Sequence, residues 1–327
     1  FPYTTLFRSG GSALMILMAV NLVAVKWFGE LESFFSIIKI LGIFLFILLG
    51  IGLSVSDFHT QSIGIKENFG QIDELLPFGF AGMVVSFPMV LFSFAGIEMI
   101  GLTVGETSDP QKNLKKAINC LPWRILFFYI GTILSILFVV PWHCLDLKES
   151  PLVTMLQVIH CQSGAAIVNL MILVASLSSA NSAVYSTSRI LYQTAKEKSL
   201  PHWFCALSKK GVPLHGILIT GMLFFAGLCL HFFVADSRLF FQLLAGMTTS
   251  CFLFVWSSIL CAHVQFIKEK KRNTTQRYKD LALLVFFTSI AFSLLFESTT
   301  RFIPFLLVIW FVFLNFVYKR ISNRNIS

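Results

Sequence analysis

The feature that most constrains this sequence is a succession of long stretches with almost no charge. Between Ser33 and Ser56 the only charged side chain belongs to Lys39, and charged residues make up only 13% of the chain. A soluble domain carries roughly 25% charged residues. Inside a bilayer the backbone must satisfy its own hydrogen bonds, and one helical span needs about 20 apolar residues. The sequence therefore predicts an all-α polytopic membrane protein.

Apolar runs of this kind predict about nine transmembrane helices in the printed sequence. Their approximate bounds are 10–25, 34–56, 80–105, 125–142, 164–188, 213–234, 239–266, 281–297 and 302–318. The connections between them are polar. The two longest, 57–79 and 143–163, are expected to hold short helices at the membrane surface.

Lys and Arg residues are distributed unevenly between alternate connections. When the connections are assigned in turn to the two faces of the membrane, 19 of the 25 basic residues fall on one side and four on the other. Such an excess marks the cytoplasmic side. The count supports the number of spans, because one missed span would scramble the alternation. It also predicts a cytoplasmic C-terminus.

The first nine residues, FPYTTLFRS, are expected to lie outside the natural protein. They look like the translation of a common DNA-sequencing adapter, and such segments are excluded from reasoning about the fold. The alternative is a natural aromatic N-terminus. On the first interpretation, residues 1–9 are an artefact, the membrane domain covers residues 10–320 and is N-terminally incomplete, and residues 321–327 form a cytoplasmic tail.

Histidine and cysteine residues show no spacing typical of a metal site. The chain has seven of each, without the paired motifs that zinc or redox sites require. Cys144 and Cys161 fall in one connection, so they could form a disulfide in an oxidising compartment or remain free thiols. The net charge of +9 follows from basic loops and indicates topology, not a nucleic-acid partner. We expect no catalytic residue, no enzyme activity and no bound cofactor.

The stretch LFSFAGIEMIGLTVGETSDP, residues 91–110, places three glycines and two glutamates in an apolar region. A glycine in a helix interior costs about 1 kcal/mol relative to alanine, so Gly96 predicts a break in the helix. Backbone groups freed inside a bilayer are tolerated only where they face protein, water or a ligand. Transporters use such broken helices to bind a carboxylate or an ammonium group.

Glu98 directly follows the predicted break. Acidic side chains inside membranes are rare and usually functional, so Glu98 is a candidate to support the unwound backbone or to carry a proton. The alternative is that the small residues only allow close helix packing and that Glu98 is a structural carboxylate. Glu106 lies before Asp109 and Pro110, so we expect it to end the helix and to pair with a loop residue.

Lys39 is the second candidate site, within FFSIIKILGIFLFILLG. An ammonium group near the middle of a bilayer costs roughly 3 kcal/mol or more on insertion scales. Lys39 lies near the cytoplasmic start of its span, so its long side chain could snorkel outward. The functional alternative is a lysine that gains and loses a proton as its surroundings change.

The segment SLSSANSAVYSTSRILYQTAKEKSLP, residues 176–201, is more polar than the other predicted spans. Small hydroxyl residues allow helices to approach closely and to form hydrogen bonds with each other. The sharper alternative is that they line a substrate path. Thr248, Thr249 and Ser250 form a weaker polar patch of the same sort.

At these residues the chain resembles the amino acid permeases of the amino acid–polyamine–organocation superfamily. It is most similar to the bacterial branch that carries phenylalanine and other aromatic amino acids, proline, GABA and D-alanine/glycine. The matching segments occur in family order from residue 19 to 320. They are NLVAVKWFGELESFFSIIK, FSFAGIEMIGLTVGETSDPQKNLKKAIN, WRILFFYIGT, NSAVYSTSRILYQTAKEKSLP and KKGVPLHGILIT.

This resemblance implies a LeuT-like inverted-repeat transporter fold, in which the spans present here correspond to family spans 4–12. The broken family span 6 matches residues 92–98, so the resemblance implies a substrate-binding segment made of Phe92, Ser93, Phe94, Ala95, Gly96, Ile97 and Glu98. Phe92 would cover the substrate, and the carbonyl groups of Phe92, Ser93 and Ala95 would receive its ammonium group. Lys39 matches a lysine that couples transport to protons in some relatives.

The sequence thus predicts a secondary active transporter that imports an amino acid across a bacterial inner membrane by proton symport. The expected partners are the amino acid and the lipid bilayer, and the coupling ion is H⁺. An amino acid exchanger of the same fold and a degenerate transporter-like sensor are the alternatives. The identity of the amino acid and the oligomeric state stay open.

Overall fold

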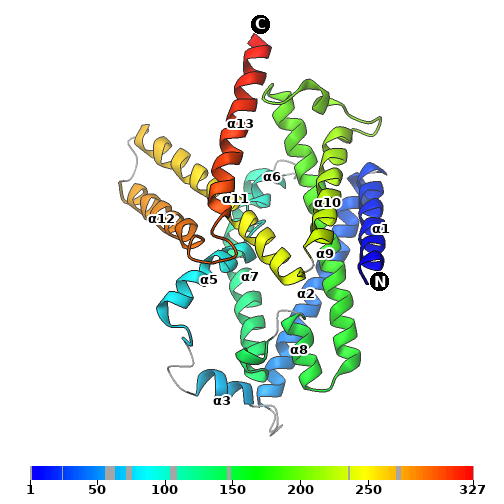
Figure 1. Ribbon diagram of the computed structural model, residues 1–327, viewed down its shortest axis with the longest axis vertical. Helices are drawn as coiled ribbons and strands as arrows, with labels where there is room; N and C mark the ends of the chain where they lie inside the picture. The colour runs from blue at the N-terminus through cyan, green and yellow to red at the C-terminus, as the bar shows by residue number, and fades with distance from the viewer. Residues whose placement is uncertain are drawn as a thin grey trace. The chain divides into compact units, whose positions relative to one another are not determined.

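The computed structural model describes residues 2–23, 25–55, 63–70, 76–103, 109–145, 149–234, 236–269 and 274–326 (Figure 1). Within these ranges the regular secondary structure is helical, apart from an isolated bridge between Leu207 and Pro213. The all-α fold predicted from the apolar runs is confirmed.

Each predicted span corresponds to one main helix in the described ranges, and the span 80–105 also contains the short helix α6 (Met99–Thr103) after its break. The main helices are α1 (Pro2–Val23), α2 (Val25–Val55), α5 (Gly79–Ser93), α7 (Pro110–Val139), α9 (Gln162–Lys196), α10 (Leu214–Phe233), α11 (Ser237–Glu269), α12 (Thr274–Ser293) and α13 (Ile303–Ile326). Shorter elements lie between them. They are α3 (Ile63–Phe69), α6 (Met99–Thr103), η2 (Trp142–Cys144), α8 (Pro151–Val158) and η3 (His202–Cys205).

Five of the described helices are long and apolar enough to cross a membrane by length and composition. These are α7, α9, α11, and the segments Ser33–Ser54 of α2 and Leu214–His231 of α10. Two shorter apolar segments are Gly79–Ser93 and Ile303–Lys319. Large apolar side chains such as Trp123, Phe233 and Phe305 are exposed, as expected where lipid replaces water around a protein.

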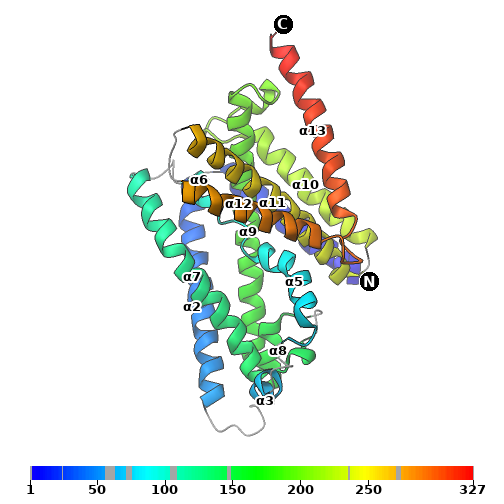
Figure 2. The ribbon, with the colours of Figure 1, turned by 90° about the vertical axis from the view of Figure 1, so that its left-hand side faces the viewer.

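The chain divides into two compact units. The first contains residues 1–75, 99–233 and 324–327. Here α2 packs along α7 and also contacts α9, and the pair α1 and α10 packs on α9 (Figure 2). Its largest apolar core joins α2, α7, α8 and α9 through residues such as Phe46, Ile136, Val140 and Met155.

In this first unit, Asn68 of α3 forms hydrogen bonds with the end of α7. Its amide nitrogen donates to the carbonyl oxygens of Leu137 and Val140, at 2.7 and 2.9 Å, and its amide oxygen accepts from the Trp142 N–H at 2.9 Å. The side chain is buried, and these three bonds satisfy carbonyl and N–H groups that the end of a helix leaves without partners. The short helix α3 therefore has a defined structural role.

The second unit contains residues 76–98 and 234–323. In it α5 packs against α11 and α12, which also pack against each other. The Thr249 hydroxyl links α11 to α5 by donating to the Pro88 carbonyl oxygen at 3.0 Å. Near the other end of α11, His263 Nδ1 lies 2.8 Å from an oxygen of the buried carboxylate of Asp280 in α12. Polar contacts of this kind orient helices that apolar packing alone leaves free to slide.

Candidate functional site

The helix that carries the predicted binding segment is interrupted where the sequence predicts. Helix α5 ends at Ser93, residues 94–98 form consecutive turns, and α6 begins at Met99. Gly96 has a φ of +101°, in a region that residues with a Cβ rarely adopt. The turns are held by tight bonds, from Phe94 N–H to Leu91 O at 3.0 Å and from Ala95 N–H to Phe92 O at 3.1 Å.

Glu98 supports this turn directly. Its Oε1 accepts the Gly96 N–H at 3.2 Å, which is one of the two roles that the sequence predicts for it. Its Oε2 is buried and has no hydrogen-bond partner within the described structure. A buried carboxylate oxygen without a donor is costly. Glu98 Oε2 is therefore a strong hydrogen-bond acceptor beside the interrupted backbone.

The other members of the predicted binding segment surround this turn. The Phe92 ring lies edge-on to Phe241 of α11, with 5.9 Å between ring centres. The Ser93 hydroxyl donates back to the Val90 carbonyl oxygen at 2.6 Å, and Phe94 and Ile97 are half-buried. Of the three carbonyl groups expected to receive an ammonium group, that of Phe92 already accepts the Ala95 N–H.

Lys39 lies in the first unit, on the face of α2 that meets α9. Its Nζ donates to the Ser178 hydroxyl at 2.9 Å, and Ser178 is fully buried. An apolar cavity of about 120 Å³ adjoins the lysine and is lined by residues that include Gly42, Phe46 and Met171. The ammonium group thus contacts an internal hydroxyl, a partnership that hydropathy and spacing in the sequence did not identify.

The polar residues of α9 differ in the partners that they contact. Asn181 accepts a 2.7 Å hydrogen bond from Asn21 of α1, and the Ser188 backbone lies against Gly216 of α10. Ser176 and Ser179 donate to carbonyl oxygens of their own helix. Asn181 and Ser188 thus lie at contacts with neighbouring helices, whereas Ser176 and Ser179 are exposed. Ser178 differs from these four because it contacts Lys39, a predicted functional side chain.

The sequence also made predictions about Glu106, about two cysteines and about metal ligands. Glu106 lies outside the described residues. Cys144 and Cys161 are free thiols. Within the described ranges, no three His, Cys, Asp or Glu side chains are grouped as metal ligands.

A polar pocket that the sequence analysis missed lies in the second unit. Its lining includes Gln242 and Thr249 of α11 and Ser293, Glu297 and Thr300 from the end of α12 and the turns after it. The signal in the sequence is the run SLLFESTT, residues 293–300, in which one acidic and four hydroxyl side chains end an apolar span.

An interrupted apolar helix, seen at residues 93–99, and an ammonium group held between two apolar helices, seen at Lys39, are each features of membrane transporters. The comparisons with known proteins agree with this class. The family model "Amino acid permease" matches residues 3–324. The chain therefore belongs to the amino acid permease family, as its resemblance predicts. It is a multi-pass membrane protein of a family that transports amino acids and is not an enzyme.

Individual relatives cover almost the whole chain. The D-serine/D-alanine/glycine transporter of Escherichia coli (strain K12) is 30% identical over 335 residues, which are 99% of this chain and 71% of the relative. Amino-acid permease AapA of Bacillus subtilis (strain 168) is 35% identical, over 95% of this chain and 69% of the relative. The "Probable threonine/serine transporter YbxG" of the same strain is 35% identical, over 83% and 58%.

Proposed function

We propose that this permease imports an amino acid by proton symport across a bacterial inner membrane, with its C-terminus in the cytoplasm. Amino acid transport follows from the family. The proposal adds two points to the family's activity: transport is inward, and the coupling ion is H⁺. The excess of basic residues on one set of connections supports the orientation.

The observation that carries proton coupling is the contact between Lys39 of α2 and Ser178 of α9. The Nζ–Oγ distance is 2.9 Å, in a region where an apolar cavity adjoins the lysine. A charged ammonium donates a stronger hydrogen bond than a neutral amine. Gain or loss of the proton therefore strengthens or weakens a link between two long helices. Such a change in helix contacts is the kind of event that can couple a proton to a conformational step.

The substrate site in this proposal is the turn between α5 and α6. The main chain at residues 94–98 and the Glu98 carboxylate offer polar groups to a zwitterion. The names of two relatives, a D-serine/D-alanine/glycine transporter and a "Probable threonine/serine transporter", support an amino acid with a small, neutral side chain. Alanine, serine and glycine are the first substrates to test.

Replacing Lys39 by alanine tests the coupling. We expect the Lys39→Ala variant of the complete protein to lose accumulation driven by a pH gradient, because no ammonium then forms at Ser178. Uptake of labelled alanine, serine or glycine into vesicles with an imposed pH gradient is the measurement. Lys209→Ala, at an exposed turn, is the control and should accumulate substrate as the wild type does.

The response to an imposed pH gradient separates symport from exchange, because both kinds of carrier can catalyse counterflow without a gradient. A symporter with Lys39→Ala should lose gradient-driven accumulation, whereas an exchanger should show counterflow in both variants and no response to the pH gradient. Accumulation at the wild-type level by Lys39→Ala under a pH gradient would contradict the role of this lysine.

A further inference from the structure

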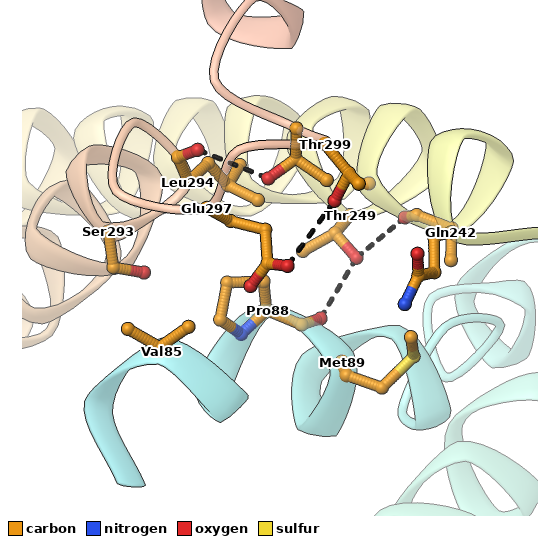
Figure 3. A pocket seen from close by; sticks show the side chains of 12 residues that line it. Val85, Pro88, Met89, Gln242, Thr249, Ser293, Leu294, Glu297 and Thr299 are labelled. Atoms are coloured by element: carbon orange, nitrogen blue, oxygen red, sulfur yellow. Dashed lines mark hydrogen bonds between the residues drawn. The ribbon is translucent and has the colours of Figure 1, made fainter. Parts of the chain in front are cut away.

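The polar pocket of the second unit is built from three separate segments. Helix α5 contributes Pro88, α11 contributes Gln242 and Thr249, and residues 293–300 contribute Ser293 and Glu297 (Figure 3). Its volume is about 90 Å³. Figure 3 shows the Glu297 carboxylate directed towards Pro88 of α5. The pocket therefore joins residues far apart in the sequence around one acidic side chain.

The hydroxyl groups that line this pocket keep oxygen lone pairs with which they can accept. A hydroxyl has one proton to donate and two lone pairs with which to accept. Each hydroxyl proton here is already donated within the protein. Thr249 donates to Pro88 and Ala245, Ser293 to Ile290, Thr299 to Glu297, and Thr300 to Leu294. These hydroxyls can therefore act towards a ligand as acceptors.

The charge of the pocket comes from Glu297. Among the described residues that line it, none is basic. Thr299 donates to Glu297 Oε1 at 3.3 Å, which orients the carboxylate but brings no positive charge. Ser293, Thr249 and Thr300 are buried, so the surroundings are less polar than water. A carboxylate in such surroundings attracts a cation more strongly than one at an open surface.

We propose that this pocket binds a compact monovalent cation, either an alkali ion such as Na⁺ or the head group of a primary ammonium. One carboxylate balances one positive charge, and hydroxyl and carboxylate oxygens are the ligands that hard cations prefer. A cavity holds one water molecule when about 10–15 Å³ of it is open to a water-sized sphere. A volume of about 90 Å³ thus admits a small cation with a few waters.

Binding at this pocket has a structural consequence for α5. Pro88 and Met89 line the pocket, and α5 ends at Ser93. Met89 and Ser93 are four positions apart, which is about 6 Å along the helix axis. A bound cation would hold this last turn of α5 to α11 and to residues 293–300. The proposal stands on the pocket itself and does not depend on proton symport.

The experiment measures the thermal unfolding midpoint of the full chain in detergent at constant ionic strength. NaCl and, separately, methylammonium chloride replace N-methyl-D-glucamine chloride, whose cation is too large for the pocket. We expect one of the two small cations to raise the midpoint by roughly 2–4 °C at saturating concentration. A shift with Na⁺ alone identifies an alkali-ion site, and a shift with methylammonium alone identifies an ammonium site. Both outcomes support the proposal.

Variants separate a site from a general salt effect. Glu297→Gln keeps the shape of the side chain and removes its charge, so the shift should disappear. Glu269→Gln, at an exposed position in the same unit, should keep it. Ser293→Ala removes one acceptor oxygen and should weaken binding several-fold, which keeps the proposal testable if Glu297→Gln fails to fold. Equal shifts in wild type and Glu297→Gln, or no shift in the wild type, would overturn it.

Discussion

At the scale of single residues, Gly96 is the position where backbone conformation decides the candidate site. Its φ is +101°, and a Cβ added there would meet no atom within 4 Å. Space is therefore available for a side chain, and only the backbone conformation opposes one. The turn between α5 and α6 depends on this residue because the Gly96 N–H donates a hydrogen bond to the Glu98 carboxylate.

Gly96→Ala is expected to disturb this turn and to reduce uptake about tenfold. A residue with a Cβ in the left-handed region is strained by about 1–2 kcal/mol, and about 1.4 kcal/mol corresponds to a factor of ten. Gly101→Ala is the matched control, because Gly101 lies in α6 with nothing within 4 Å of an added Cβ and no left-handed φ. Initial rates of amino acid uptake by both variants, normalised to the amount of protein in the membrane, give the comparison. Equal rates would show that the positive φ at residue 96 has no part in transport.

At the scale of elements, Gly50 allows close packing of α2 on α7. A Cβ on Gly50 would lie 2.4 Å from Ser135 Cβ and 2.8 Å from Ser135 Cα. The Ser135 hydroxyl also donates to the Ile47 carbonyl oxygen at 3.3 Å. Small residues at such a contact let two backbones approach, which is a main source of helix association in membranes.

Gly50→Ala is expected to lower the free energy of unfolding by about 1–3 kcal/mol, the usual cost of overpacking. The backbone of Ser135 cannot move aside as a flexible side chain does. Gly52→Ala, two residues further along the same helix with nothing within 4 Å of its Cβ, should be neutral or stabilising because alanine favours a helix. The thermal unfolding midpoints of the purified variants test this difference. A Gly50→Ala protein as stable as Gly52→Ala would contradict the close contact.

Sequence patterns predicted the helices well but not which helices meet. The uncharged run around Lys39 and the glycine-rich stretch at Gly96 predicted a spanning helix and an interrupted one, because hydropathy and glycine act locally. The bond from Lys39 to Ser178 joins residues 139 positions apart. Local patterns show which residues lie on the same helix. Which residue of another helix a side chain contacts is decided by tertiary packing. The pocket around Glu297 was missed for the same reason.

At the scale of the whole molecule, the distribution of basic residues predicts which connections face the cytoplasm. Cys161 lies in the connection assigned to the outer side and is exposed, whereas Lys209 lies in an exposed turn assigned to the cytoplasmic side. Both positions lie in the same unit and in connections outside the long apolar helices. Their accessibility to a reagent that does not cross the membrane therefore reports orientation directly.

The expected result is that Cys161, as the only cysteine in the complete protein, reacts with a membrane-impermeant maleimide in intact cells. A cysteine placed by Lys209→Cys in a cysteine-free protein should react only after the cells are opened or in inside-out vesicles. The physical reason is that positively charged connections are retained on the cytoplasmic side during insertion. Transport of the wild-type substrate by both variants controls for misfolding. If the thiol at residue 209 is labelled in intact cells and Cys161 is not, the orientation is the reverse of the one proposed. The proposal that substrate enters from outside would then be wrong as well.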